Sequence, residues 1–153
     1  MKKIICLTVI LYFFTSGFSQ SYQRAAGIRI GSSVGVSYKQ FTTESRAYEG
    51  IVDVDIIGRN VTKFKATFNY LFHYNLKPDG LSLYGGPGVS AGIYISGDYR
   101  DKLSTSIGLT GGIEYKFPDS PIILAFDWDP KFQMITDAGL KPASFGLTLR
   151  YSF

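Results

Sequence analysis

The side chains in this sequence that could do chemistry are few, and most are carboxylates in closely spaced pairs. Asp53 and Asp55 lie two residues apart, as do Asp127 and Asp129, so each pair shares one face if its segment is a strand. Such a pair could supply the two carboxylates of a retaining glycosidase, or it could bind a cation. We favour a third interpretation, in which the carboxylates form ion pairs with Lys and Arg across a polar interior.

Two other features invite a catalytic or binding interpretation. His73 is the only histidine, so a metal site built on several histidines is excluded. The run Gly85-Gly86-Pro87-Gly88 resembles a phosphate-binding loop only in its glycine content, because no Gly-Lys-Ser/Thr follows it. We interpret the run as a kink in a strand. The sequence thus predicts no catalytic residue, no cofactor and no metal.

The first residues have the composition of an export signal. A positive start, Lys2-Lys3, precedes the apolar segment Ile4–Phe14, and a small, polar stretch ends at Ser19. The apolar segment is too short to cross a bilayer as a helix. We therefore expect a signal peptide over residues 1–19 and a single mature domain over residues 20–153.

Loss of this signal would change what the mature chain can do. Cys6, the only cysteine, lies inside the apolar segment and would be removed with it. The mature chain would then have no disulfide, no thiolate metal site and no cysteine nucleophile. The net charge of +4 would also fall, because Lys2 and Lys3 leave with the signal. No basic run remains, so nucleic-acid binding is not expected.

After residue 20, apolar and polar residues alternate in segment after segment, which predicts β-strands with one apolar face. The last segment shows this best, because Phe145, Leu147 and Leu149 share one face. Thr148 and Arg150 share the other. Turn-forming residues separate the segments. The predicted strands are Tyr22–Gly31, Val34–Phe41, Arg46–Ile57, Thr62–Tyr74, Leu81–Ile95, Ser104–Phe117, Ile122–Met134 and Ser144–Phe153.

The number of strands depends on residues 21–41, which could be one long strand or a hairpin. An exported chain of alternating strands suits the outer membrane of a Gram-negative bacterium, where a barrel needs an even strand number and both termini on the periplasmic side. We therefore divide this segment at Ser32-Ser33. The predicted fold is all-β, an eight-stranded antiparallel up-and-down transmembrane β-barrel. Its periplasmic turns are Thr42–Ser45, Lys77–Gly80 and Pro118–Pro121, and its longer outer connections are Ser96–Leu103 and Thr136–Pro142.

Alternation alone does not show whether the apolar face meets lipid or fills a core. The interior of an eight-stranded barrel is only just wide enough for its own side chains. The apolar face carries too many aromatic residues to fit there, whereas glycine, serine and threonine are frequent on the opposite face. We therefore expect the apolar face to meet lipid. The alternative is a soluble lipocalin-like barrel that binds a small apolar ligand, and it would need the two faces reversed.

The inward face then carries charges of both signs. These charges must pair, because an isolated buried charge is costly. Such a network would plug the lumen, so a wide diffusion pore is not expected. Its predicted members are the acids Glu49, Asp53, Asp55, Glu114, Asp127 and Asp129 and the bases Arg29, Lys39, Lys63, Lys65, Lys116, Lys131 and Arg150.

The mature chain resembles the small OmpA/OmpX-type outer-membrane barrels. The resemblance lies in the strand pattern of the whole mature chain, in the segment Asp127-Trp128-Asp129-Pro130, and in the final strand, which ends with an aromatic residue. It implies that Tyr151 and Phe153 form a signal read by the barrel assembly machinery. It also implies a barrel-only member with a structural or interaction role, whose other partners are outer-membrane lipids.

An outer loop and His73 leave two further roles to consider. Tyr99, Arg100, Asp101 and Lys102 form the most exposed charged patch, and Arg100 and Lys102 could contact the phosphates of lipopolysaccharide. The loop could also simply be solvated. An outer-membrane enzyme that modifies lipid A would need His73 beside a serine near the lipid interface. We expect no enzyme.

Overall fold

The computed structural model describes residues 22–55 and 62–153, and all regular elements in these ranges are strands. No helix in the described part of the chain is long and apolar enough to cross a membrane. The predicted signal peptide lies outside the described residues, as do Ile56 and Ile57 of the third predicted strand. The strands are β1 (Arg24–Gly31), β2 (Ser33–Thr43), β3 (Arg46–Asp55), β4 (Lys63–Asn75), β5 (Leu81–Tyr94), β6 (Leu103–Lys116), β7 (Ile122–Trp128), β8 (Lys131–Ile135), β9 (Gly139–Lys141) and β10 (Phe145–Ser152).

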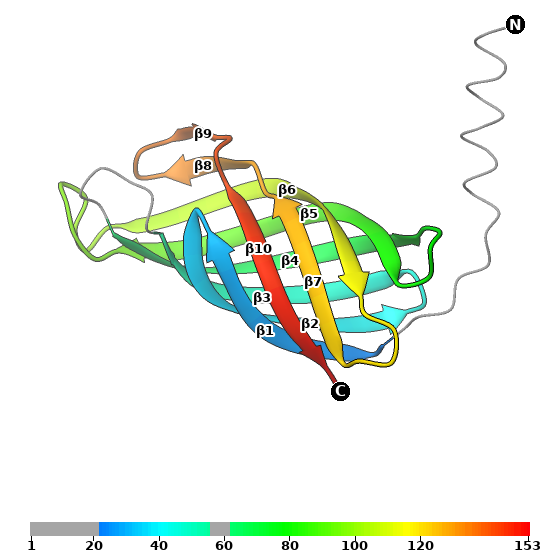
Figure 1. Cartoon of the computed structure of the whole chain (residues 1–153). Helices are drawn as coiled ribbons and strands as arrows, with labels where there is room; N and C mark the ends of the chain where they lie inside the picture. Colours follow the sequence, from blue (N-terminus) through cyan, green and yellow to red (C-terminus); the bar gives the residue numbers. More distant parts are fainter. Residues whose placement is uncertain (1–21, 56–61) are drawn as a thin grey trace, which may run out of the picture.

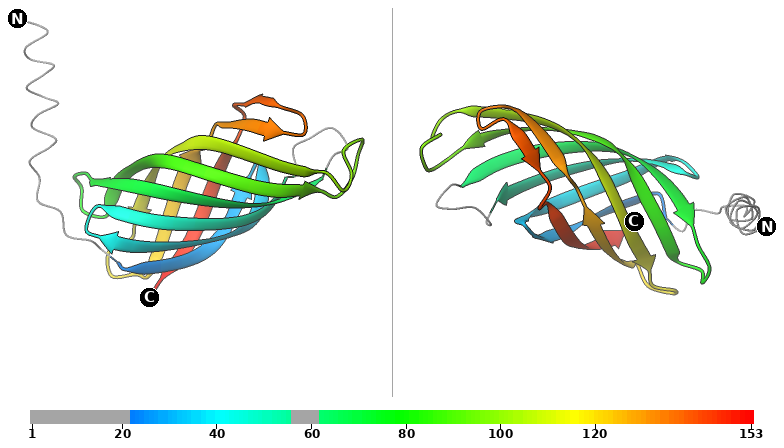
Figure 2. Two further views of the ribbon diagram at one scale, coloured as in Figure 1. Left: turned by 180° about the vertical axis from the view of Figure 1, so that it is seen from behind. Right: turned by 90° about the horizontal axis from the view of Figure 1, so that it is seen from above.

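The strands close into one antiparallel barrel (Figures 1 and 2). Consecutive strands pair from β1 to β7, and β10 pairs with β7 on one side and with β1 on the other. The closing ladder runs from Ala25 opposite Ser152 to Gly31 opposite Gly146. β7 and β8 both pair with β6 and occupy one position in the wall. The predicted fold class, a closed eight-stranded antiparallel barrel, is confirmed.

The division of the N-terminal segment at Ser32-Ser33 is also confirmed. β1 ends at Gly31, β2 begins at Ser33, and the two strands pair with each other. Small residues suit this turn, because a Cβ at Gly31 would collide with the carbonyl oxygen of Phe145. Ser32 connects this turn to β10 by a hydrogen bond, because its Oγ donates to the carbonyl oxygen of Phe145 at 3.1 Å.

The prediction of a single strand over Ile122–Met134 is wrong. The structure divides it into β7 and β8 at Asp129-Pro130, because proline has no N–H to donate to a ladder. The Pro130 carbonyl still accepts a hydrogen bond from the backbone N–H of Leu109, at 3.2 Å. Beyond the break, β8 pairs with β9, which lies inside the connection predicted as a loop. The two form a hairpin that projects from the barrel beyond the start of β10 (Figure 1).

The two ends of the barrel differ. At one end lie the start of β1, the end of β10 and the short connections at 44–45, 76–80 and 117–121; we call it the terminal end. At the other lie the 95–102 connection and the β8–β9 hairpin; we call it the loop end. The three turns predicted as short thus lie together at the terminal end, and the two connections predicted as longer lie at the loop end.

The barrel carries its apolar side chains outside and its charged side chains inside. Arg29 and Arg150 are each 1% exposed, whereas Ile28, next to Arg29 on β1, is 61% exposed. A soluble protein shows the opposite distribution. The interior also contains a small apolar cluster toward the terminal end, formed by Ala47, Leu71, Tyr84 and Ala125 with Phe41 packed against it.

Candidate functional site

Four buried charges near the terminal end form a balanced quartet, which we call the terminal-end quartet: Lys39, Glu49, Glu114 and Arg150. Arg150 forms a direct ion pair with Glu49, and its Nη1 lies 3.6 Å from Glu114 Oε2. Lys39 Nζ lies 2.8 Å from the same Glu114 oxygen. Four different strands supply these side chains, so the quartet ties opposite walls of the barrel together.

Aromatic side chains surround the quartet. Lys39 Nζ lies 4.0 Å from the centre of the Tyr84 ring, a cation–π contact. Tyr22, just before β1, donates to Glu114 Oε1 at 2.8 Å and packs edge-to-face on Phe41. Burial, together with the negative charge of Glu114, raises the pKa of Tyr22 well above its ordinary value. Tyr22 therefore stays a neutral donor to the carboxylate.

His73 lies inside the barrel between two aromatic rings. Its ring centre is 4.6 Å from that of Phe41 and 5.2 Å from that of Tyr84, on which it stacks. Its Nδ1 lies 3.7 Å from Glu114 Oε1, and neither ring nitrogen has a hydrogen-bond partner among the described residues. A Ser–His nucleophile requires a serine hydroxyl that is hydrogen-bonded to a ring nitrogen of the histidine. Among the described residues, His73 has no such hydrogen bond.

A second group of charges occupies the middle of the lumen. Arg29 forms an ion pair with Asp127, and its Nη1 lies 3.8 Å from Asp53 Oδ2. Tyr84 donates to Asp127 at 3.1 Å and so connects this group to the terminal-end quartet. Gly146 makes the arrangement possible, because a Cβ at this position would collide with the Arg29 guanidinium.

A third group lies toward the loop end. Lys65 forms an ion pair with Asp55 and lies 3.7 Å from Asp53. Lys63 lies 3.7 Å from Asp55 and donates to Gln133 Oε1 at 3.0 Å. Asp53 thus has cationic neighbours in both this group and the middle group, so the ion pairs form a continuous chain across them.

Lys131 and Asp129 complete the loop-end group, with Lys131 Nζ 2.8 Å from the carboxylate. Asp129 also accepts from Thr110 at 3.0 Å, and Lys131 donates to Thr67 at 3.1 Å. Each carboxylate of the Asp127/Asp129 pair therefore has its own cationic partner. Among the described residues, no group of three or more His, Asp or Glu side chains is arranged to hold a metal ion.

Two of the features singled out by the sequence, Lys116 and the run of residues 85–88, lie apart from these groups. Lys116 donates to the backbone carbonyl of Ser120 at 3.1 Å, at the terminal end. Within residues 85–88, the β4–β5 ladder pairs Phe72 with Gly85 and Asn69 with Gly88, and no pairing joins the strands between these two rungs. This interruption coincides with Pro87, which has no N–H to donate.

Sequence reasoning missed the neutral partners of the charges. Ser33 donates to Asp53, Ser37 accepts from Arg150 Nε at 2.8 Å, and Gln133 accepts from Lys63 Nζ at 3.0 Å. Each of these residues lies on the inward face of its strand, as does Tyr84, and this position was the available signal. The sequence offered no way to tell which inward polar residue meets which charge.

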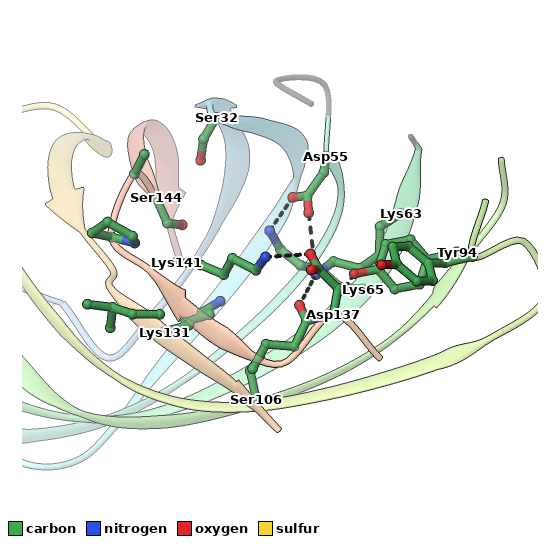
Figure 3. Close-up of a pocket in the computed structure, with 15 residues that line it drawn as sticks. Ser32, Asp55, Lys63, Lys65, Tyr94, Ser106, Lys131, Asp137, Lys141 and Ser144 are labelled. Atoms are coloured by element: carbon green, nitrogen blue, oxygen red, sulfur yellow. Dashed lines mark hydrogen bonds and ion pairs between the residues drawn. The ribbon is translucent and has the colours of Figure 1, made fainter. Parts of the chain in front are cut away.

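The loop end of the lumen opens into a cavity of about 450 Å³, which we call the mouth cavity (Figure 3). Strands from around the barrel contribute to its wall, and charged side chains converge in it (Figure 3). Tyr94 and Tyr99 also line it, with ring centres 5.6 Å apart. Its charged lining residues are Asp55, Lys63, Lys65, Lys131, Asp137 and Lys141.

The remaining predicted residues lie on the outside. Tyr151 and Phe153 are 56% and 64% exposed, and the Phe153 backbone N–H donates to the carbonyl oxygen of Arg24 at 3.0 Å. Arg100 and Asp101 lie in the exposed connection between β5 and β6, with Arg100 Nε 3.8 Å from Asp101 Oδ2. Lys102 Nζ lies 5.5 Å from the Tyr99 ring centre.

Comparison of the chain with protein-family models, with curated proteins and with solved structures found no match.

Proposed function

We propose that this chain is an exported outer-membrane protein of a Gram-negative bacterium, a barrel-only member of the OmpA/OmpX type with a structural or interaction role. The observation that carries the proposal is the inverted burial of the barrel. Large apolar side chains are exposed on the strands, and arginine, lysine and carboxylate side chains are buried within. In water this arrangement would expose the apolar faces of the strands, whereas in a bilayer those faces meet acyl chains.

Barrel closure supports the same proposal. In a bilayer, an unpaired backbone N–H or C=O costs several kcal/mol, so a spanning sheet must close on itself. Here the β1–β10 ladder closes the ring. A membrane-spanning strand needs about ten residues. The strands β2 to β6 meet this length, with 11, 10, 13, 14 and 14 residues, whereas β1 and β10 have 8 each and β7 has 7 before the break at Pro130.

The placement of aromatic residues also fits a bilayer. Tyr48, Tyr74 and Tyr151 are exposed, and each lies near the terminal end of its strand. Tyrosine side chains of this kind suit a membrane interface, since the ring is apolar and the hydroxyl is polar. On the proposed orientation, the terminal end faces the periplasm and the loop end faces outward.

We propose further that the lumen is plugged and that the protein has no catalytic role. The three groups of ion pairs extend from the terminal-end quartet to the mouth cavity, and their members come from facing walls. A lipocalin-like function would need the aromatic face turned inward, whereas Phe68, Phe126 and Trp128 are at least half exposed.

Cell fractionation and electrophoresis test the proposal. The protein should be recovered in the outer-membrane fraction, and the unboiled protein should migrate differently from the boiled protein, because a folded barrel resists the detergent. Recovery from the soluble periplasm, with one mobility before and after boiling, would contradict it. Liposomes that contain the protein should not swell in isotonic sugar, and rapid swelling would show that the lumen is an open pore.

A further inference from the structure

The wall of the mouth cavity is richer in cations than in anions. Its lysines are Lys63, Lys65, Lys131 and Lys141, and its carboxylates are Asp55 and Asp137. Two other carboxylates pair with these lysines, Asp53 and Asp129, but both are only 2% exposed and neither lines the cavity. The four lysines therefore line the cavity, while two of the carboxylates that compensate their charge are buried in the barrel and do not line it.

Lys63 is the least compensated of these lysines. Its Nζ is 3.7 Å from Asp55, too far for a hydrogen bond, and Asp55 is already paired with Lys65. The like charges of Lys65, Lys131 and Lys141 act on it as well. Among the described residues, Lys63 has one neutral partner at hydrogen-bond distance, Gln133 at 3.0 Å, and an anion in the cavity would add a charged partner closer than Asp55.

Neutral groups around the cavity also suit an oxyanion. The side-chain oxygen of Ser144 is buried and has no hydrogen-bond partner among the described residues, although it lines the cavity. Ser106 adds a further hydroxyl to the wall. Ammonium and hydroxyl donors together bind phosphate oxygens well, with lysine acting as a point charge.

We propose that the mouth cavity binds a phosphate group. Its volume of about 450 Å³ lies in the range of small-molecule sites. The group could come from a free phosphorylated solute or from the head group of a surface lipid, since both present the same oxygens. This inference goes beyond the proposed function, because the cavity is formed by the barrel itself and holds in any medium in which the barrel is folded.

Phosphate titration of the full chain, folded in dodecyl maltoside micelles, tests the proposal. The readout is the shift of backbone amide resonances. Inorganic phosphate should shift amides of cavity residues, among them Ser144 and Gln133, and leave the turn at 76–80 unchanged. Added sodium chloride should weaken the binding, since the attraction is electrostatic.

Charge variants make the test specific. The double variant Lys63→Gln/Lys141→Gln should raise the dissociation constant about tenfold or more, the change expected for loss of one charge-assisted hydrogen bond. Lys77→Gln removes the same type of charge at the terminal end and should change little. If Lys77→Gln weakens binding as much as the double variant, phosphate responds only to net charge and the proposal is wrong.

Asp137→Asn provides a test that keeps every lysine. It removes the carboxylate that lies 2.5 Å from Lys141 Nζ and competes with the anion. Phosphate should then bind about threefold more tightly, as expected for an exposed ion pair. Asp79→Asn at the terminal end is the matched control. An unchanged or weaker affinity in Asp137→Asn would contradict the proposal, even if the lysine variant fails to fold.

A second titration separates the two sources of phosphate. Phosphatidic acid mixed into the micelles presents the same group on a lipid. Shifts of the cavity amides with inorganic phosphate at up to about 50 mM, which corresponds to weak millimolar affinity, would indicate a free solute. Shifts with phosphatidic acid alone would indicate a lipid head group. If neither probe shifts these amides, the cavity does not bind phosphate.

Discussion

Arg150 shows what a single residue contributes to this barrel. It is buried, it contacts Glu49 and Glu114, and its Nε donates to Ser37. A buried ion pair adds little stability on balance, because desolvation of the two ions offsets their attraction. Loss of one partner is different, since the other charge is then left buried and uncompensated.

We therefore expect Arg150→Met to destabilise the barrel by about 3–5 kcal/mol. Glu49→Met should have a similar effect, whereas the double variant should lose clearly less than the sum, because neither charge is then left alone. Urea unfolding of the protein in lipid vesicles measures all three. Additive losses would show that the two side chains do not act as a pair.

The exposed pair Lys141–Asp137 is the control for this cycle. Its side chains are 44% and 46% exposed, so solvent screens their attraction. Lys141→Met should change the unfolding free energy by about 1 kcal/mol or less. A loss as large as that of Arg150→Met would mean that burial does not set the effect.

For single residues, the sequence predicted whether a side chain points inward or outward, but it did not predict which side chains contact each other. Alternation placed Arg29 inside and Ile28 outside, because side chains in a strand point to opposite faces. It did not indicate that Lys39 would pair with Glu114, 75 positions away. That contact depends on which strands face each other across the lumen and on their register, and neither leaves a trace in a local pattern.

Among the elements, the ladder between β1 and β10 decides whether the barrel closes. Gly27 lies where the two strands approach closely, and a Cβ there would collide with the carbonyl oxygen of Leu149. Gly50 on β3 serves as the control position, because a Cβ added there would have no atom within 4 Å. The two glycines allow a matched comparison of the same substitution.

Gly27→Val should destabilise the closed barrel by about 1–3 kcal/mol or prevent closure altogether, because the added atoms force the strands apart. Gly50→Val should be neutral or stabilising, since β-branched residues favour strands. The fraction of heat-modifiable protein and the urea midpoint measure both effects. Equal losses in the two variants would indicate that the β1–β10 approach is not the sensitive point.

The break between β7 and β8 and the short strand β9 were not predicted from the sequence. The alternation of Ile122, Leu124 and Phe126 continues to Phe132 and Met134, so the pattern predicted one strand. The structure interrupts it at Pro130, whose missing N–H outweighs the continuous alternation. β9 could not be predicted, because three residues are too few to show a period and the strand depends on pairing with β8.

The stability of the whole molecule depends on the surrounding medium, because a barrel with apolar outer faces is stable only in a medium that solvates apolar side chains. Leu149 lies near the middle of β10, between Ile28 and Leu124 on the neighbouring strands, and is 53% exposed. Leu103 is the first residue of β6, at the loop end, and is 63% exposed. In water these two positions would be equivalent surface sites. In a bilayer they lie at different depths.

Leu149→Arg and Leu103→Arg therefore test the proposed membrane location through the fold itself. A charge at the bilayer midplane costs about 2–4 kcal/mol, and one near the interface about 0–1 kcal/mol. We expect Leu149→Arg to lower the unfolding free energy in lipid vesicles by the larger amount and Leu103→Arg by the smaller. On a soluble protein, both substitutions would replace an exposed leucine and would stay within about 0.5 kcal/mol. A Leu149→Arg variant as stable as the parent, and more soluble without detergent, would show that water, not lipid, meets the apolar face.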